Sequence, residues 1–353
     1  MHLKSLDLVD FRNFEKVGFQ FSEGINFIIG ENGTGKTNLL EAIYLLGNGV
    51  SLKKSHLRYL VRIGQELTTI EGKIVDEIGA STLQIELRNG KRTIFKDGNP
   101  VKLMRDFLGS FLVLGFSPDN LGLIKGGSLA RRSLVDKQVI DLHPEMIGHY
   151  GMFSRSLLHK RSLLKDGSAI EHLEPWNRII ARCSSFILRE RAVVVSLLNS
   201  HVPGTFQNLF GVERCVSLEY RPTYGGLFEE EAIYELLQKN RIRELRMRRP
   251  LIGPHLDDIE IRLDGKPIKE FASQGQIRSV AIALLLANAE ILEEKLGRIP
   301  ILVLDDVDSE LDEIRKSILL TLVTGSNRQV FISSTDARFR QDVRFANSTF
   351  VTV

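Results

Sequence analysis

The stretch that decides the fold reads Gly30-Glu31-Asn32-Gly33-Thr34-Gly35-Lys36-Thr37. It follows an apolar run over residues 25–29 and precedes a helix-like stretch over residues 38–46. In that order of strand, loop and helix, glycines let backbone N–H groups turn inward around a phosphate chain. The helix N-terminus adds partial positive charge at the same place. The pattern therefore predicts a phosphate-binding P-loop.

The last two residues of this loop carry side-chain chemistry. Lys36 can reach the β- and γ-phosphates of a nucleotide, and the hydroxyl group of Thr37 can ligate Mg²⁺. The alternative is a glycine-rich turn in which the Lys-Thr pair stands by chance. The flanking strand and helix favour the P-loop.

The composition is that of an ordinary globular protein. The chain has 353 residues, of which 43% are hydrophobic and 26% charged, so one large domain or two are expected. No apolar run approaches the roughly 18 residues that span a bilayer. The two cysteines, Cys183 and Cys215, form neither a disulfide framework nor a zinc site. We therefore expect a cytoplasmic protein without a membrane partner.

The predicted type of secondary structure changes twice along the chain. Residues 1–117 predict an α/β segment with several strands, at 3–11, 18–21, 68–73, 83–87 and 92–96. Residues 118–250 predict an inserted, mainly helical lobe, in which Pro175 begins a long amphipathic helix. Residues 251–353 return to α/β, with buried strands at 301–304 and 330–332. The predicted fold class is therefore α/β, with a helical insertion between the two halves.

Two carboxylates, Asp305 and Asp306, follow the predicted strand at 301–304. A carboxylate at the end of a buried strand near a P-loop is the Walker B arrangement. Asp305 would then serve Mg²⁺, and Asp306 would orient or deprotonate the attacking water. A carboxylate pair at a helix start is the structural alternative. The long separation from Lys36 opposes a compact P-loop kinase.

The segment Ser273-Gln274-Gly275-Gln276 immediately precedes a predicted helix that extends to residue 296. Ser273 and Gln276 predict a capping box, and the structural alternative ends there. The functional interpretation is a second phosphate-binding helix N-terminus. Together with Asp305 and Asp306, this loop resembles the signature loop of ATP-binding-cassette (ABC) ATPases, which acts on nucleotide held by a partner's P-loop. In that resemblance Ser309-Glu310-Leu311-Asp312 is the D-loop.

The resemblance extends to the RecF family of bacterial recombination and repair proteins over nearly the whole chain. The motifs that carry it are the P-loop with its helix, Asp10-Phe11-Arg12-Asn13-Phe14, Phe116-Ser117-Pro118, Arg131-Arg132-Ser133-Leu134-Val135-Asp136, Gly253-Pro254-His255-Leu256-Asp257-Asp258, and residues 271–278 and 304–312. The Gly-Pro-His block is not expected in transporter ATPases.

The resemblance implies an SMC-like ABC ATPase head with ATP and Mg²⁺ as cofactors, homodimerisation with ATP, and slow, DNA-stimulated hydrolysis. It also implies binding of single-stranded, gapped or double-stranded DNA, recombinase loading with RecO and RecR, and roles in replication-fork maintenance and the SOS response. Arg12 and Asn13 resemble family residues near the nucleotide, and a simple turn is their alternative.

The chain departs from the family pattern at two places. Leu256 replaces the arginine of Gly-Pro-His-Arg-Asp-Asp, so the role of that arginine is not carried over. Arg248-Arg249-Pro250 stands where the family has Gly-aromatic-Thr. At Asp306 the chain has the family's own residue, and this Asp is shorter than the catalytic Glu of most ABC ATPases, which is consistent with slow turnover. The role of His255 stays open between phosphate sensing and structure, and that of Asp336 between a switch and a helix cap.

Two basic segments are candidates for a DNA path: Arg241, Arg243 and Arg246 in residues 239–249, and Arg131 and Arg132 in residues 125–165. Clustered cations suit a phosphate backbone, and a solvated helix face is the alternative. No nuclease-like carboxylate cluster appears, so chemistry on DNA is not expected. The rival functions are a transporter-coupled ABC ATPase, a P-loop kinase and a purely structural SMC-like protein.

Overall fold

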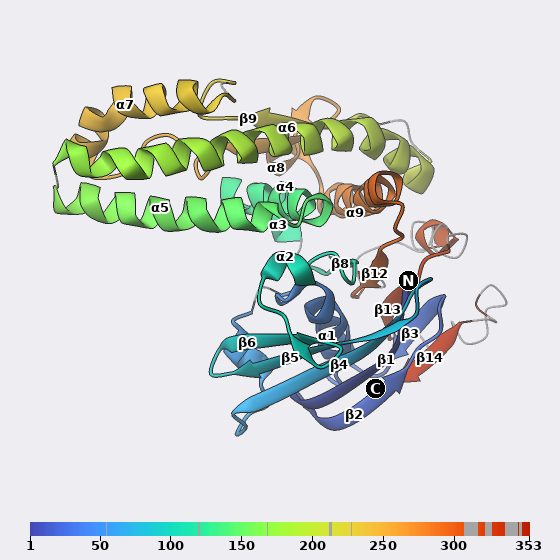
Figure 1. Cartoon of the computed structure of the whole chain (residues 1–353). Helices are drawn as coiled ribbons and strands as arrows, with labels where there is room; N and C mark the ends of the chain where they lie inside the picture. Colours follow the sequence, from blue (N-terminus) through green and yellow to red (C-terminus); the bar gives the residue numbers. More distant parts are fainter. Residues whose placement is uncertain are drawn as a thin grey trace. The chain divides into compact units, whose positions relative to one another are not determined.

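The computed structural model describes the chain except residues 54, 119–120, 168, 212–213, 227, 307–316, 322–326, 336–344 and 346–347, and the side chain of residue 123. The described chain divides into two compact units (Figure 1). Unit 1 comprises Met1–Leu121, Gly204–Glu213 and Ser273–Val353, and unit 2 comprises Gly122–Pro203 and Arg214–Ala272. The boundary predicted at residue 250 therefore falls inside unit 2.

Unit 1 contains a six-stranded antiparallel sheet in the order β2-β1-β4-β5-β6-β7. Its strands are β1 (His2–Phe11), β2 (Phe14–Gln20), β4 (Leu67–Val75), β5 (Ala80–Arg88), β6 (Lys91–Lys96) and β7 (Asn99–Pro100). Asn89 and Gly90 both have positive φ, which suits the two-residue turn between β5 and β6. Leu83, Ile85 and Leu87 alternate into the core, because successive strand residues point to opposite faces.

A second sheet of unit 1 is parallel and has the order β14-β3-β13-β12-β8. Its strands are β3 (Ile25–Ile29), β8 (Val113–Phe116), β12 (Ile301–Leu304), β13 (Val330–Ser334) and β14 (Thr349–Thr352). Every residue of β3, β12 and β13 is buried. This confirms the predicted apolar strands at 301–304 and 330–332, since a strand covered on both faces reads as a continuous apolar run.

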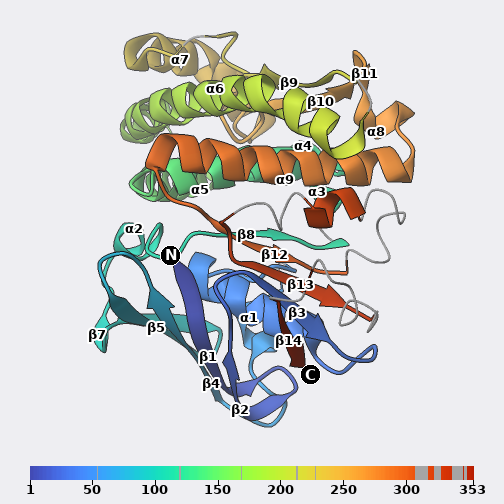
Figure 2. The same ribbon diagram turned by 90° about the vertical axis from the view of Figure 1, so that its right-hand side faces the viewer.

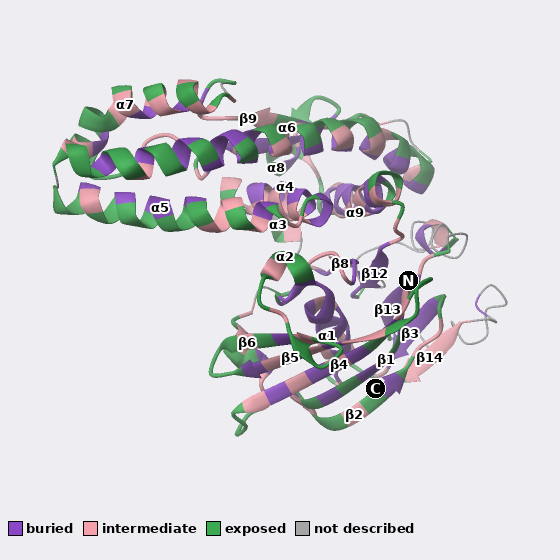
Figure 3. Cartoon of the chain, viewed as in Figure 1, coloured by how far each residue is buried: buried purple, intermediate pink, exposed green. Residues whose placement is uncertain are grey.

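Helix α1 (Lys36–Asn48) lies between the two sheets and contacts strands of both (Figure 2). Its buried residues join those of the sheets in one hydrophobic core, which Figure 3 shows as buried segments in α1 and in the strands around it. Unit 1 also holds the short helices η1 (Leu57–Leu60) and α2 (Met104–Phe107), and the long helix α9 (Gln274–Leu296). Helix α9 is long and apolar enough to cross a membrane, but most of it is buried as in a core helix.

Unit 2 is mainly helical. Its helices are α3 (Leu121–Lys125, from residue 122), α4 (Ser128–Leu142), α5 (Met146–Asp166), η3 (Ile170–Leu173), α6 (Glu174–Phe210, to residue 203), α7 (Glu230–Met247) and α8 (Ile268–Phe271). The long helix predicted from Pro175 is confirmed, and Ile180, Cys183 and Ile187 of its apolar stripe are buried.

Unit 2 also contains a three-stranded sheet that the sequence did not predict. Its strands are β9 (Val216–Arg221), β10 (Asp258–Leu263) and β11 (Lys266–Pro267), in the order β11-β10-β9. Strand β10 alternates buried and partly exposed residues and contacts α4. Because β9 and β10 pair across the residue-250 boundary, the chain after residue 250 stays with unit 2 until residue 272.

Candidate nucleotide site

The P-loop lies between β3 and α1, in the predicted order of strand, loop and helix. Gly33 and Gly35 have φ of 88° and 123°, a backbone region that favours glycine. A Cβ atom on Gly35 would lie 2.7 Å from Nδ2 of Asn13. Nζ of Lys36 donates to the carbonyl oxygens of Gly30 at 2.7 Å and Glu31 at 2.8 Å. The lysine charge is therefore held at the loop, where phosphate binding would require it.

Asn13, in the turn between β1 and β2, forms side-chain hydrogen bonds with the P-loop and with α1. Its Nδ2 donates to the carbonyl oxygen of Thr34 at 2.8 Å. Its Oδ1 accepts a hydrogen bond from Nδ2 of Asn38 at 2.7 Å, so the same side chain reaches the first turn of α1. The structure thus places Asn13 beside the loop and gives it a supporting role.

Arg12 does not face the P-loop with a free guanidinium group. Its Nε donates to Glu41 at 2.9 Å, Nη1 to the carbonyl oxygen of Tyr59 at 3.0 Å, and Nη2 to Ser55 at 3.2 Å. Glu41 is fully buried in α1 and also accepts a hydrogen bond from Ser51. Buried Glu41 thus has Arg12 as its charge partner, and the contact of Arg12 with nucleotide stays a prediction.

Asp305 stands at the carboxyl edge of the parallel sheet, directly after β12. Its Oδ1 accepts hydrogen bonds from Oγ1 of Thr37 at 3.0 Å and from Oγ of Ser333 at 2.8 Å. The structure thus brings the predicted Walker B carboxylate to the last residue of the P-loop. Carboxyl ends of parallel strands share one edge of a sheet, which is why residues distant in sequence meet here.

The electrostatics at this edge centre on the burial of Asp305, which is 3% exposed. Burial raises the pKa of the Asp305 carboxyl above its ordinary value, while the hydrogen bonds from Ser333 and Thr37 and the charge of Lys53 oppose that rise. Asp306 is exposed, has a positive φ of 51°, and donates its backbone N–H to Ser333 at 2.8 Å. The two carboxylates therefore occupy different environments.

The oxygen donors of Thr37 and Asp305 fit a hard divalent cation such as Mg²⁺, which prefers hydroxyl, carboxylate and water ligands. Among the described residues, no group of three or more His, Cys, Asp or Glu side chains could hold a metal ion. A cation at this edge would therefore depend on Thr37, Asp305, water and phosphate oxygens together, as in P-loop sites.

The predicted capping box at the start of α9 is confirmed. Oγ of Ser273 accepts from the backbone N–H of Gln276 at 3.3 Å, and the backbone N–H of Ser273 donates to Oε1 of Gln276 at 2.8 Å. Ser273 and Gln274 are exposed, and Gly275 is partly exposed, so this helix N-terminus is open to solvent. The predicted D-loop at residues 309–312 and Asp336 lie outside the described residues.

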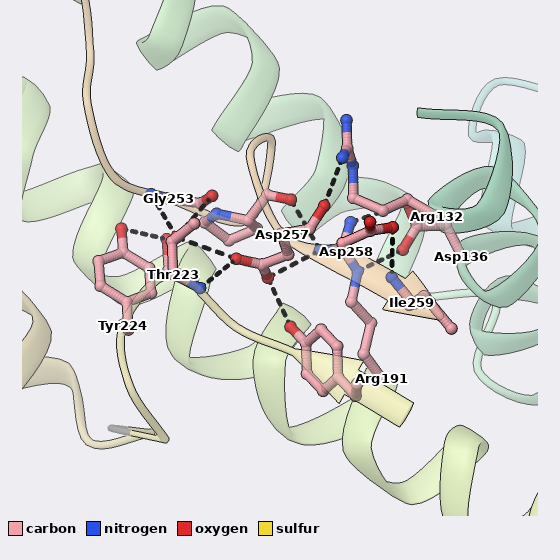
Figure 4. Close-up of polar contacts among 12 residues, drawn as sticks. Arg132, Asp136, Arg191, Thr223, Tyr224, Gly253, Asp257, Asp258 and Ile259 are labelled. Atoms are coloured by element: carbon pink, nitrogen blue, oxygen red, sulfur yellow. Dashed lines mark hydrogen bonds and ion pairs between the residues drawn. The ribbon is translucent and has the colours of Figure 1, made fainter. Parts of the chain in front are cut away.

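The Gly-Pro-His block of unit 2 is organised by a buried charge network (Figure 4). Arg191 donates to both carboxylate oxygens of Asp136 at 2.7 and 2.9 Å, to Oδ2 of Asp257 at 3.1 Å, and to the carbonyl oxygen of Pro254 at 2.8 Å. Asp257 also accepts hydrogen bonds from the backbone N–H and the hydroxyl group of Thr223, at 2.8 and 2.9 Å. The network joins α4, α6 and the block.

The same network overturns one part of the predicted DNA path. Arg132 is 6% exposed and donates to the carbonyl oxygen of Asp257. Arg131 makes hydrogen bonds at 2.8 and 2.9 Å to the two carboxylate oxygens of Asp258. The prediction that Arg132 binds DNA is wrong, because a buried side chain cannot reach a phosphate backbone. The same role for Arg131 stays a prediction.

The other predicted basic segment is placed differently. Arg241, Arg243 and Arg246 lie on α7 and are exposed, as are Arg248 and Arg249 just beyond it. Glu244, the acidic residue among them, is buried and forms an ion pair at 2.7 Å with Lys160, which is also buried. The exposed face of this segment therefore carries the cations, while its single carboxylate is turned inward.

The roles of His255 and Leu256 stay unassigned. Both ring nitrogens of His255 are buried without a hydrogen-bond partner among the described residues. Burial, together with the charges of Arg161, Arg132, Lys160 and Arg191, lowers the pKa of His255 to about 3. Leu256, which replaces the family arginine, is 45% exposed.

Sequence reasoning missed Ser333, Glu41, Asn38 and Arg191 as members of these networks. Ser333 had a usable signal, because it directly follows the strand predicted at 330–332 and polar residues at that edge collect in one place. Glu41 and Arg191 had no such signal. Each is a charged residue in a helix, a pattern that usually indicates a solvated face.

The chain is similar to known proteins over nearly its whole length. The family described as RecF/RecN/SMC N terminal domain matches residues 2–352. A DNA replication and repair protein RecF from Leptospira interrogans is 34% identical over 346 residues, 97% of this chain and 94% of the relative. A solved structure of the recombination mediator protein RecF-ATP in the RecFOR pathway has a TM-score of 0.88 and 30% identity, covering 97% of this chain and 94% of that one.

A more distant structure bears on the fold alone. The Smc head domain with an extended coiled coil, bound to the C-terminal domain of ScpA, from Pyrococcus furiosus has a TM-score of 0.58 and 16% identity. It covers 100% of this chain and 93% of its own. The predicted SMC-like ABC ATPase head fold is thereby confirmed. From the family match and the relatives above 30% identity, the chain belongs to the RecF family of RecF/RecN/SMC proteins.

Proposed function

We propose that this chain is an ATP-dependent DNA-binding protein of recombinational repair and replication-fork maintenance, and that ATP controls its dimerisation. The observation that carries the proposal is the hydrogen bond between Thr37 and Asp305, which unites the P-loop with the carboxylate that a nucleotide-bound Mg²⁺ needs. Its RecF relatives are named for DNA replication and repair, and one was solved with ATP.

Within the nucleotide site each residue has a proposed part. The P-loop N–H groups and Lys36 bind the phosphates, and Thr37 and Asp305 hold the cation. Asp306 orients the attacking water or accepts its proton, which its solvent exposure permits. Mg²⁺, when bound, neutralises charge that develops on the phosphates. Because an aspartate is shorter than a glutamate, hydrolysis is slow and serves as a switch.

The exposed N-terminus of α9 supports a site shared between two subunits. Ser273 and the following N–H groups can receive an anion, and Lys36 already serves the phosphates from its own P-loop. We infer that residues Ser273 to Gln276 contact the γ-phosphate of ATP held by a second copy. ATP then joins two subunits, and its hydrolysis separates them, which is a ligand-driven shift between association states.

DNA binding is proposed for the exposed cations of α7. Arg241, Arg243 and Arg246 suit a phosphate backbone and would bind single-stranded, gapped or double-stranded DNA with little sequence preference. We further propose that DNA stimulates hydrolysis, and that RecO and RecR are partners in recombinase loading and in support of the SOS response. A protein in that role would work at the nucleoid in the cytoplasm.

The oligomeric state tests this function directly. Light scattering after size-exclusion chromatography should show a monomer without nucleotide or with ADP, and a dimer with ATP and Mg²⁺. Gapped DNA added with ATP should shift the equilibrium further toward the dimer, because DNA binds the ATP-bound state more tightly. A monomer under every condition would overturn ATP-controlled dimerisation. Metabolite-stimulated ATP consumption without any response to DNA would favour a kinase.

A further inference from the structure

Ser333 makes two hydrogen bonds with one hydroxyl group, and they reach both predicted acidic residues. Its Oγ donates to Oδ1 of Asp305 at 2.8 Å and accepts the backbone N–H of Asp306 at 2.8 Å. Ser333 is 2% exposed, so water does not readily replace either partner. It lies in β13, the strand between the P-loop strand β3 and the Asp305 strand β12.

The backbone around Ser333 is held on both sides. Ser333 is in register with Ile28 of β3, and β13 pairs in parallel with β12 as well. The N–H of Asp305 donates to the carbonyl oxygen of Phe116 at 2.9 Å, which fixes the start of the turn after β12. The Ser333 hydroxyl therefore extends from a rigid position in the sheet, and it can orient the groups that it contacts.

Asp306 needs such support because its backbone is left-handed. A φ of 51° is unfavourable for a non-glycine residue, and it persists only where surrounding contacts maintain it. Among the described residues, Oγ of Ser333 is the acceptor for the Asp306 N–H. Without it, the turn could relax and carry the exposed Asp306 carboxylate away from the edge.

We propose that Ser333 is a positioning residue that couples the cation-holding carboxylate of Asp305 to the hydrolytic carboxylate of Asp306. By donating to Oδ1, the serine fixes the rotation of the Asp305 carboxylate, so that Thr37 and Asp305 keep a common orientation toward a cation. By accepting a hydrogen bond from the backbone N–H of Asp306, it fixes the main-chain position from which the Asp306 side chain extends. The inference rests on the proposed nucleotide function, and it assigns no direct contact with ATP to Ser333.

A matched pair of variants isolates the hydroxyl group. Ser333→Thr and Ser333→Val introduce side chains of nearly the same shape at a strand position that favours β-branched residues, and only the first keeps a hydroxyl. The affinity of fluorescently labelled ATP is measured with excess Mg²⁺ and with EDTA. Single-turnover hydrolysis and the thermal melting midpoint are measured on the same preparations.

The expected result separates binding of the phosphates from use of the cation. Ser333→Val should bind ATP in EDTA as the wild type does, because the P-loop is unchanged. The factor by which Mg²⁺ increases the affinity for ATP should be about tenfold smaller than in the wild type, which corresponds to about 1.4 kcal/mol. Ser333→Val should also hydrolyse ATP more slowly. Ser333→Thr should stay within about twofold of the wild type in each measurement.

The outcomes that overturn the inference are distinct. If Ser333→Thr and Ser333→Val behave alike, whether both like the wild type or both impaired, the hydroxyl group does not position the carboxylates. If Ser333→Val loses affinity equally in Mg²⁺ and EDTA, its role is packing of the sheet. A wild type that shows no ATP binding in either condition would overturn the proposed nucleotide site, and this inference with it.

Discussion

The hydroxyl group of Thr37 donates a hydrogen bond to Oδ1 of Asp305 across 3.0 Å, although 268 positions separate them in the sequence. The whole of unit 2 is inserted between them. Parallel strands β3 and β12, with β13 between them, bring the two residues to one edge of the sheet. The nucleotide site is therefore complete only when β3, from the first part of unit 1, and β12 and β13, from its last part, lie in one sheet.

The first prediction concerns Lys36. We expect Lys36→Ala to abolish productive ATP binding, because it removes the P-loop cation that faces the phosphates. Lys36→Arg should retain some nucleotide but lose the geometry, since a guanidinium fork is not a point charge. Calorimetric titration with ATP and Mg²⁺ measures both, and wild-type affinity in Lys36→Ala would refute the P-loop assignment.

The second prediction concerns subunit sharing. Ser273→Arg should bind ATP as a monomer yet fail to dimerise or hydrolyse it, because the arginine blocks the open N-terminus of α9. Asp306→Asn should do the reverse and trap an ATP-bound dimer that holds DNA tightly. Sedimentation with ATP distinguishes these states. Normal dimerisation of Ser273→Arg would return Ser273 to a helix cap and nothing more.

Mixing two inactive variants is the control for this arrangement. A dimer of Ser273→Arg with Lys36→Ala has one site with an intact P-loop and an intact signature loop, while its other site has lost both. The mixture should recover part of the ATPase activity, provided that one intact site holds the pair together. No recovery at any ratio, from variants that each fold normally, would argue that the site is contained within one subunit.

The third prediction concerns the exposed cations of α7. Replacing Arg241, Arg243 and Arg246 with Ala should weaken DNA binding for all sequences and reduce its salt slope by up to roughly three. ATP binding should survive, because the variants leave the P-loop untouched. Fluorescence anisotropy over a range of salt concentrations measures the slope.

A charge-matched control for that variant lies in unit 1. Arg88, Lys91 and Lys96 are exposed cations on β5 and β6, and their replacement with Ala removes the same charge. This control should leave the slope nearly unchanged. An equal loss in both triple variants would mean that net charge alone governs DNA binding, and an unchanged slope in the α7 variant would exclude this face.

The fourth prediction concerns His255 and pH. Its pKa is lowered from 6.5 to about 3 in the folded protein, so the unfolded chain binds the proton more readily. The contribution of neutral His255 to the free energy of unfolding is thus complete above pH 6.5. It is lost as the pH falls toward 3, by up to about 1.4 kcal/mol per pH unit. His255→Gln cannot titrate and should show a flatter decline of the urea unfolding midpoint between pH 7 and 4. Parallel declines in the two proteins would contradict the burial argument.

Much of unit 1 could be predicted because its signals are local. The P-loop spacing, the apolar runs at 301–304 and 330–332, and the Ser273–Gln276 capping box each lie within a few residues, and the structure shows each of them. The P-loop and the capping box could each be recognised without knowing a partner elsewhere in the chain. Residue type and spacing alone determine whether a loop can wrap a phosphate or a serine can cap a helix.

Tertiary structure alone decided which charged side chains face inward. Arg132 and Arg241 are both arginines in helical, basic segments, yet Arg132 is buried against Asp257 and Arg241 is exposed on α7. Likewise Ser333 became part of the site only when β13 was placed between β3 and β12. A sequence shows charges and hydroxyl groups, but their partners come from strands and helices far away in the chain. Burial then makes those distant partners obligatory, because an unpaired buried charge is too costly.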